Sequence, residues 1–242
     1  ALVTGGSRGI ARAIAVGLAQ DGADVAVNYR RDADAAAEVV VEVEKLGRRA
    51  IAVGASVDDA EADAGMVERV VDELGGLSIL VNNAGQASRG NTVADTDPGE
   101  VAKLLATHAV GAHHLCRLAV PHLRQGERGD VVFVSSIATT NFQARGAPYS
   151  MGKAAMEALA WTLAKEERDN GIHVNVVAPG VVHTEMGRRL VRSWGADIDE
   201  LDARSPFGHV CRPEEVADVV RFLVGPGAGY LTAQRIVING GG

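Results

Sequence analysis

The sequence predicts an α/β protein built on a doubly wound parallel sheet, and three observations support this prediction. Short runs rich in β-branched residues alternate with longer segments of helical pattern along the 242 residues. The short runs are apolar almost throughout, as expected for strands that helices cover on both faces. No linker, repeat or low-complexity segment interrupts this alternation, so we expect one domain over residues 1–242.

The strands follow in order from their β-branched runs. They are expected at 1–4, 24–29 (DVAVNY), 50–54 (AIAVG), 78–82 (SILVN), 130–135 (DVVFVS), 172–177 (IHVNVV) and 235–238 (RIVI). Helices are expected between them, at 9–21, 33–46, 60–74, 98–124, 149–170 and 213–224. The stretch 183–212 breaks this rhythm. Because insertions beyond a strand's carboxyl end commonly form binding loops, we expect a lid over the substrate there.

Composition and charge narrow the class of protein. Apolar residues make up 47% of the chain and charged residues 23%, which is typical of a globular protein with a buried core. The net charge of −7 argues against nucleic acid or an anionic membrane as partners. No apolar run approaches the ~18 residues of a membrane span. Cys116 and Cys211 lie outside any C-x-x-C pattern, so we expect reduced thiols and a cytoplasmic location.

Glycines cluster between the first strand and the first helix, in LVTGGSRGIARAIA (2–15). Glycine lets the backbone turn tightly and approach a pyrophosphate, which then binds at the helix N-terminus. The spacing T-G-x-x-x-G-x-A differs from the usual G-x-G-x-x-G, but its place between a strand and a helix favours a dinucleotide site. The contacts expected from this turn are Gly5, Ser7, Arg8, Gly9 and Ile10.

Basic residues follow the second strand, which ends in VNYRR. NAD-specific folds often place a carboxylate at this end to bind the ribose 2′-hydroxyl, but here the position holds Tyr29. Arg30 and Arg31, together with Arg8 of the glycine turn, suit a 2′-phosphate instead. We therefore predict NADP(H) rather than NAD(H) as cofactor. The alternative is that Arg30 and Arg31 are solvated residues beside a helix start.

A tyrosine and a lysine stand near the start of the helix expected at 149–170. Tyr149 and Lys153 are four residues apart, so they share one face of the helix. Alone, they would be an ordinary surface pair. Ser136 closes the fifth strand thirteen residues earlier, which makes a catalytic set the better interpretation.

Taken in order, these motifs resemble those of the short-chain dehydrogenases/reductases almost from end to end. NNAG (82–85) closes the fourth strand, VVFVSSIA (131–138) the fifth, and PYSMGK supplies Tyr-x-x-x-Lys. APGVVHTEM (178–186) resembles the Pro-Gly-x-x-x-Thr loop that holds the nicotinamide. The resemblance implies a Rossmann-type sheet of seven strands in the order 3-2-1-4-5-6-7. It also implies NADP(H)-dependent reduction of a ketone, or the reverse oxidation of a secondary alcohol. Within the family the chain is most similar to the 3-oxoacyl-(acyl-carrier-protein) reductases, the polyketide ketoreductases and the glucose dehydrogenases.

The resemblance also implies a role for each residue. Tyr149 is the acid and base, Ser136 orients the substrate oxygen, and Lys153 binds the nicotinamide ribose. A free phenol has a pKa near ~10, so the cation one turn away is expected to lower the pKa of Tyr149. The further cofactor contacts implied are Ser56, Val57, Asn83, Ala84, Gly85, Tyr149, Lys153, Pro179, Gly180, Val182 and Thr184.

The chain departs from the family at His108, three residues before Gly111, where an asparagine normally kinks the helix and exposes a carbonyl for a proton relay. Histidine could kink the helix less and break the relay, or supply its own proton route, or simply be tolerated. Ser56 stands where the family usually has an acidic or amide residue against adenine. No metal site is expected, because His113, His114 and His122 lack the i, i+4 spacing of helical ligands.

The substrate and the assembly follow only in outline. An acidic carrier protein would need a basic patch near the cleft, and the candidates are Arg124, Arg128, Arg188, Arg189 and Arg192. The apolar residues expected under the lid are Met186, Leu190, Trp194, Leu201 and Phe207. By resemblance we expect a homotetramer, or a homodimer, using the helices at 98–124 and 149–170. Two alternatives stay open: a cofactor-binding sensor or scaffold whose catalysis has decayed, and an NAD-dependent sugar or alcohol dehydrogenase.

Overall fold

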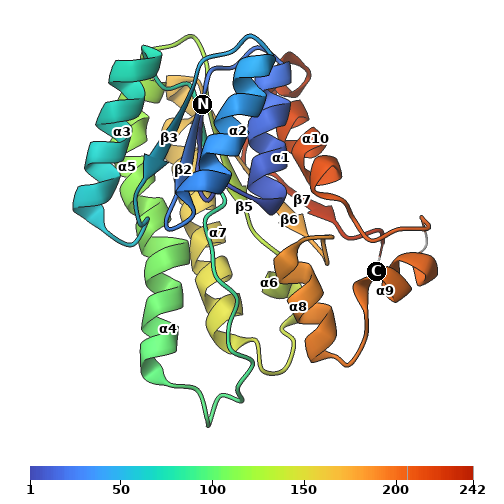
Figure 1. Ribbon diagram of the computed structural model, residues 1–242. Helices are drawn as coiled ribbons and strands as arrows, with labels where there is room; N and C mark the ends of the chain where they lie inside the picture. The colour runs from blue at the N-terminus through green and yellow to red at the C-terminus, as the bar shows by residue number, and fades with distance from the viewer. Residues whose placement is uncertain (206, 242) are drawn as a thin grey trace.

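A seven-stranded parallel sheet forms the centre of the computed structural model, which describes residues 1–205 and 207–241 (Figure 1). Its strands are β1 (Leu2–Val3), β2 (Val25–Tyr29), β3 (Ala50–Gly54), β4 (Ile79–Asn82), β5 (Gly129–Val134), β6 (Ile172–Pro179) and β7 (Arg235–Ile238). Their order is β3-β2-β1-β4-β5-β6-β7, so the predicted topology is confirmed. Because every pair is parallel, all carboxyl ends meet at one edge.

Helices cover both faces of the sheet (Figure 1). One layer contains α1 (Gly9–Gln20), α2 (Ala33–Lys45) and α10 (Pro213–Val224). The other contains α3 (Ala60–Leu74), α5 (Gly111–Leu123) and α7 (Ala147–Glu167), with α4 (Pro98–Leu105) preceding α5. Successive residues of β5 alternate between the two cores: Val131 and Phe133 pack into one, Val132 and Val134 into the other. This explains why the strand is apolar throughout.

The predicted helix 98–124 is interrupted. A π-helical turn at Ala106–Val110 separates α4 from α5 and contains His108. Gly111 follows the turn, and a Cβ there would lie 1.9 Å from the carbonyl oxygen of Val57, so only glycine fits. Single π turns inside α-helices often mark functional positions.

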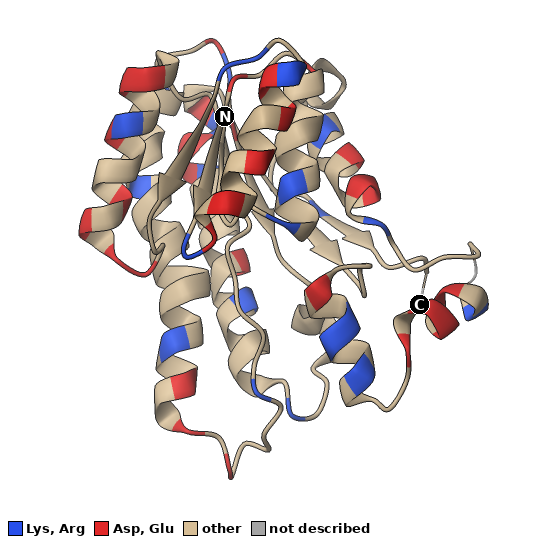
Figure 2. Cartoon of the chain, in the orientation of Figure 1, with Lys and Arg blue, Asp and Glu red and all other residues tan. Residues whose placement is uncertain are grey.

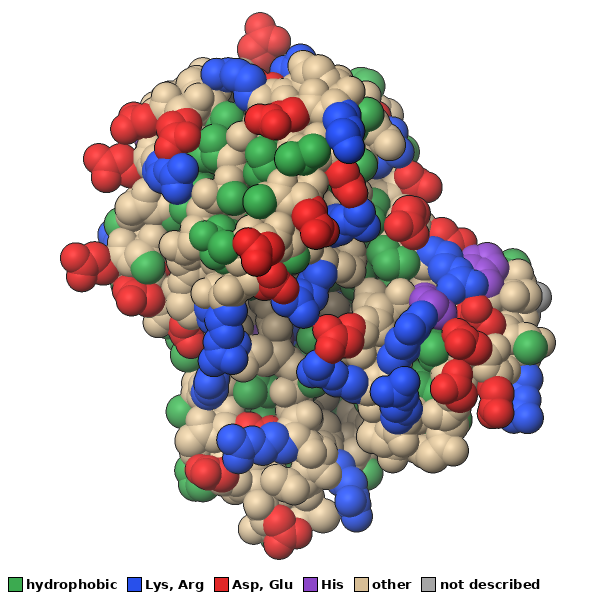
Figure 3. Space-filling view, in the orientation of Figure 1, with side chains coloured by type: hydrophobic (Ala, Val, Ile, Leu, Met, Phe, Trp, Pro, Cys, Tyr) green, Lys and Arg blue, Asp and Glu red, His purple; other side chains and the backbone are tan. Residues whose placement is uncertain are grey.

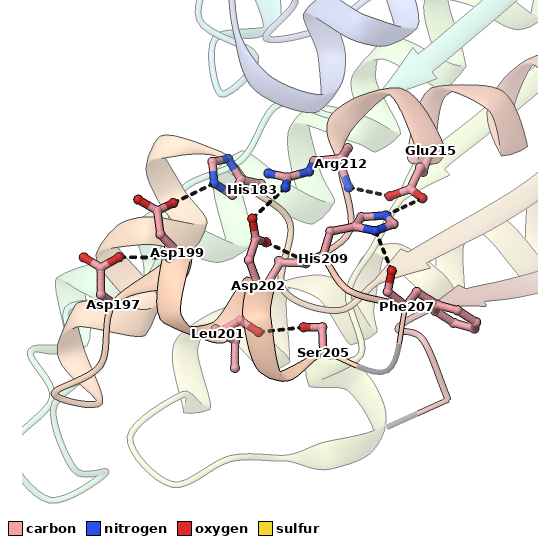
Figure 4. Close-up of polar contacts among 11 residues, drawn as sticks. His183, Asp197, Asp199, Leu201, Asp202, Ser205, Phe207, His209, Arg212 and Glu215 are labelled. Carbon is pink, nitrogen blue, oxygen red and sulfur yellow. Dashed lines mark hydrogen bonds and ion pairs between the residues drawn. The ribbon is translucent and has the colours of Figure 1, made fainter.

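The stretch 183–212 forms two helices beyond β6, α8 (Glu185–Ser193) and α9 (Ile198–Arg204). A small separate core of Val191, Ile198 and Val210 holds them together, and Leu201 packs against it. Figure 4 shows the polar contacts of this region, including the 2.6 Å ion pair between Asp202 and Arg212. Figure 2 shows basic residues along α8 and acidic residues on α9. The remaining apolar residues predicted for the lid, Met186, Leu190, Trp194 and Phe207, are exposed.

The other elements are short. They are α6 (Ala138–Asn141), which follows β5, and 3₁₀ turns at Arg168–Asn170 and Pro226–Ala228. Among the described residues, no helix combines the length and the apolar character needed to cross a membrane.

Candidate active site

Three predicted residues meet at the carboxyl edge of the sheet. Ser136 follows the end of β5 at Val134, and Tyr149 and Lys153 lie in the first turns of α7. Lys153 is 4% exposed, and its ammonium donates to the Val134 carbonyl at 2.6 Å and lies 5.9 Å from the centre of the Tyr149 ring. The Ser136 hydroxyl lies near enough to the phenol to lower its pKa. The geometry therefore brings together a hydroxyl, a phenol and a buried cation.

Burial shifts the pKa of both titratable groups. It raises the pKa of Tyr149 above the ordinary value, and the Ser136 hydroxyl opposes this. It lowers the pKa of Lys153 to about 8, and the negative charge of Glu157 opposes that shift. Burial therefore sets the direction of the Tyr149 pKa shift in this structure, and that direction is the opposite of the one predicted from Lys153. The Lys153 ammonium is directed at the Val134 carbonyl.

His108 packs against the catalytic tyrosine candidate. Its ring meets that of Tyr149 edge-on, with centroids 5.4 Å apart, and its Nε2 lies 2.9 Å from the Gln86 carbonyl oxygen. Burial and the charge of Lys153 lower the pKa of His108 to about 3, so the ring is neutral near pH 7. The helix is distorted here by a π turn, although the residue is a histidine. A neutral imidazole has one N–H donor and one acceptor nitrogen, so a proton route through His108, a broken relay and simple tolerance all stay predictions.

The glycine turn fits a pyrophosphate. Gly5 and Gly9 have φ of +65° and +56°, a backbone region that residues other than glycine rarely adopt. A Cβ on Gly9 would lie 3.3 Å from the Thr184 methyl carbon, so the predicted contacts at 5–10 and 179–184 meet here. No side chain caps the N-terminus of α1, which leaves its first N–H groups available to an anion.

Hydrogen bonds tie the glycine turn to NNAG. The Thr4 hydroxyl accepts from the backbone N–H groups of Asn83 and Ala84, each at 3.0 Å. Asn28, a buried amide inside β2, accepts from the Gly5 N–H at 3.1 Å and donates to the Val53 carbonyl at 3.2 Å. Asn28 is not among the predicted site residues, although an amide inside an apolar strand is a signal of a functional position.

The arginines near β2 differ in their surroundings. Arg8 pairs with Asp32 at 2.6 Å and with Glu185 of α8 at 3.3 Å. The side chains of Arg30 and Arg31 are exposed and have no ion pair within the described part of the chain. Figure 3 shows a hollow between the sheet-containing part and the region of α4 and α8, with Lys and Arg side chains on its rim. Arg30 and Arg31 are thus two exposed cations after β2 that no carboxylate in residues 1–205 and 207–241 neutralises.

The remaining predicted contacts lie around the same edge. Tyr29 ends β2 beside Gly54, and the Ser56 hydroxyl donates to Asp58 at 2.5 Å. Val57 is buried in the loop after β3, and its carbonyl oxygen lies against Gly111.

The other predicted contacts lie at the end of β6 and after it. Pro179, the last residue of β6, accepts from the Ile137 N–H at 3.0 Å, and Gly180 donates to the Ile238 carbonyl at 2.8 Å. Val182 pairs with Cys211, and the Thr184 hydroxyl caps α8 through the Gly187 N–H. Gly85 lies against the His108 ring.

One group of possible metal ligands occurs among residues 1–205 and 207–241, formed by His183, Asp199 and Asp202 (Figure 4). His183 lies 3.2 Å from Asp199, while Asp202 binds Arg212 and the Val210 N–H, each at 2.6 Å. These contacts fasten α9 to the chain on either side of it.

Two of the arginines considered for a carrier protein lie away from the cleft. Arg124 follows α5 and pairs with Glu167 at 2.6 Å, and Arg128 pairs with Asp130 at 2.8 Å as β5 begins. Both positions are at the amino edge of the sheet, opposite Ser136 and Tyr149. Arg188, Arg189 and Arg192 of α8 are on the cleft side and exposed.

Comparison with known proteins gives matches along the whole chain. A family model described as enoyl-(acyl carrier protein) reductase matches residues 5–242. The chain is 37% identical to a versicolorin reductase of Emericella nidulans, covering 100% of this chain and 94% of that protein. It is 34% identical to the 3-oxoacyl-(acyl-carrier-protein) reductase FabG of Staphylococcus aureus, covering 100% and 96%. A short chain dehydrogenase from Burkholderia cenocepacia, solved in complex with NADP, superposes with a TM-score of 0.88 at 36% identity, covering 99% and 95%.

Proposed function

This chain belongs to the short-chain dehydrogenase/reductase family, and we propose that it reduces a ketone of a small molecule with NADPH, or runs the reverse oxidation. One observation carries the proposal. Ser136, Tyr149 and Lys153 gather at the same edge of the sheet as the uncapped N-terminus of α1. An acid and an anion-binding helix end are the two parts that such a reduction needs.

The roles follow from the protonation states. When bound, the reduced nicotinamide supplies the hydride that reaches the carbonyl carbon. Tyr149, whose pKa is raised, holds its proton near neutral pH and donates it to the carbonyl oxygen. The Ser136 hydroxyl orients that oxygen, and the buried Lys153 ammonium stabilises the phenolate that remains. Ketone, hydride and proton together give the alcohol.

The test of this proposal compares the wild-type protein with Tyr149→Phe. The variant should bind NADPH with nearly unchanged affinity, because the ring and the other implied cofactor contacts remain, and lose nearly all turnover. Binding is measured by NADPH fluorescence, and turnover by NADPH consumption against 3-oxoacyl thioesters, cyclic ketones and keto sugars. Substantial turnover in Tyr149→Phe would exclude the tyrosine as acid. Binding without any turnover in the wild type would favour the sensor or scaffold.

We assign the 2′-phosphate of NADPH to the two unpaired arginines after β2. Their support is their exposure and the absence of a partner carboxylate among the described residues, together with the NADP complex of the similar Burkholderia cenocepacia dehydrogenase. Replacing Arg30 and Arg31 by Gln should weaken NADPH binding and leave NADH binding unchanged. Arg168→Gln, at the amino edge before β6, is the control. Equal losses for NADPH and NADH would reject the assignment.

The substrate and the assembly are proposed from the relatives and the surface. A 3-oxoacyl thioester and an aromatic polyketide ketone are the first substrates to test, because FabG and the versicolorin reductase are similar over the whole chain. A homotetramer is proposed because Val110 and Met151, near α5 and in α7, are large apolar residues that are 48% exposed. The free thiols of Cys116 and Cys211 support a cytoplasmic location.

A further inference from the structure

We propose that Glu157 and Arg235 are positioning residues for the reaction, a largely buried ion pair that fixes Ser136 relative to Tyr149. The inference rests on the proposed function and extends it to two residues outside the Ser-Tyr-Lys set. It starts from polar side chains buried behind the site, where an apolar core would ordinarily be found.

Glu157 accepts hydrogen bonds from three side chains. It is 9% exposed on α7, and its Oε1 accepts from the Ser135 hydroxyl at 2.5 Å and from Arg235 Nε at 3.1 Å. The Thr139 hydroxyl lies 2.9 Å from the same oxygen. These donors satisfy the hydrogen-bonding needs of a carboxyl group that would otherwise be costly to bury.

Arg235 reaches the same segment from β7. Its Nη2 donates to the Ser136 carbonyl at 3.3 Å and to the Thr139 hydroxyl at 2.9 Å. Glu157 and Arg235 thus contact Ser135, Ser136 and Thr139, which precede, include and follow the predicted catalytic serine. The turn that carries Ser136 is therefore held by a helix and a strand that are distant in sequence.

The spacing along α7 makes this contact relevant to the chemistry. Tyr149, Lys153 and Glu157 are four residues apart in succession, so they lie on one side of the helix. Glu157 holds the turn that carries Ser136 through Ser135 and Thr139. Because Glu157 belongs to α7, these contacts also fix the position of Ser136 relative to Tyr149 on the same helix. A displacement of about 1 Å between such groups can cost about a hundredfold in rate.

The charge of Glu157 acts on Lys153 as well. Burial favours the neutral amine of Lys153, and Glu157 is the charge that opposes it. Without that negative charge the ammonium would lose its proton at lower pH. Glu157 thus preserves the cation that stabilises the phenolate.

The decisive variant is Glu157→Gln, which keeps the shape of the side chain and removes its charge. We expect kcat to fall by about tenfold to a hundredfold, and the alkaline decline of kcat/KM for NADPH to begin at lower pH than in the wild type. The matched control is Glu167→Gln on the same helix. Glu167 is 5% exposed and forms two hydrogen bonds with Arg124, at 2.8 and 2.6 Å, but lies at the amino edge of the sheet. The control should leave both quantities unchanged per folded molecule.

A second variant separates the positioning of Ser136 from the effect of the Glu157 charge on Lys153. Arg235→Lys keeps a positive charge but cannot bridge Glu157, Thr139 and the Ser136 carbonyl at once. It should lower kcat and leave the pH of the alkaline decline in place. If Glu157→Gln does not fold, Glu157→Asp keeps the charge on a shorter side chain and should behave like Arg235→Lys.

The outcomes distinguish this inference from the proposed function. A Glu157→Gln protein whose kcat and pH profile coincide with those of the wild type, once corrected for the folded fraction, overturns the positioning role. If the wild type shows no turnover at all, the proposed function fails instead. NADPH affinity measured by fluorescence across pH then still tests Glu157, because loss of the Lys153 cation should weaken binding at lower pH in Glu157→Gln than in the wild type.

Discussion

Because Lys153 is buried, we predict that the enzyme loses activity at moderately alkaline pH. Its pKa is lowered to about 8, so the cation exceeds the neutral amine about tenfold at pH 7 and is outnumbered about tenfold at pH 9. If the cation is needed, kcat/KM for NADPH should fall about tenfold per pH unit above about 8. Tyr149 cannot cause this decline, because its own pKa is raised above its ordinary value near 10.

The assay follows initial rates at limiting NADPH and saturating ketone, because kcat/KM for the first substrate reports the groups of the free enzyme. NADPH affinity from fluorescence at each pH supplies an independent curve. Lys153→Arg provides the comparison, since a guanidinium stays charged throughout and its residual activity should lack the decline. A wild-type profile that stays flat to about pH 10 would refute the reasoning that burial sets the state of Lys153.

Two further predictions concern the free energy of unfolding. Asp63 of α3 is 0% exposed, and burial, followed by the charges of Asp59 and Asp58, raises its pKa to about 7. The folded state therefore binds this proton more tightly than the unfolded state, and the free energy of unfolding should fall as pH rises from about 4 to about 7. Asp63→Asn should raise the free energy of unfolding by up to about 4 kcal/mol at pH 8 and change it little at pH 4. Urea unfolding at the two pH values measures this, and equal effects at both would contradict the prediction. Gly152→Ala would place a Cβ 3.0 Å from His108 Cδ2 and should lower the free energy of unfolding by about 1–3 kcal/mol. His108→Ala in the same chain should recover part of that loss, whereas strictly additive effects would show that the two residues are not coupled.

The fold could be predicted because its strands carry a strong pattern. Each is a short β-branched run, and burial on both faces makes it apolar, as the alternation of β5 residues between two cores shows. The strand order, in contrast, came only from the family resemblance, since periodicity carries no information on neighbours. Boundaries were less accurate. β1 spans only Leu2–Val3 because the chain turns at Thr4 to bond with NNAG, and β6 extends to Pro179 because Ile238 of β7 pairs with it.

The site could be predicted where residues share a helix or a turn. Tyr149 and Lys153 are four residues apart, and their relation is readable from spacing alone. Arg235 and Ser136 are 99 residues apart in sequence, and only the packing of β7 beside β6 brings them into contact. The predicted direction of the Tyr149 pKa shift was wrong for the same reason. Spacing shows the nearby cation, but not how far the phenol is removed from water.

The pairing of Arg8 changes how the cofactor end of the cleft should be understood. Arg8 and Arg30 looked equivalent in sequence, yet Arg8 is already bound to Asp32 and to Glu185 of α8. A 2′-phosphate near Arg8 would have to displace carboxylates from it, whereas Arg30 and Arg31 offer charge that no described residue neutralises. Arg8 instead joins the glycine turn to the stretch 183–212. Arg8 thus contributes to holding α8 beside the glycine turn, rather than to the free positive charge that Arg30 and Arg31 offer.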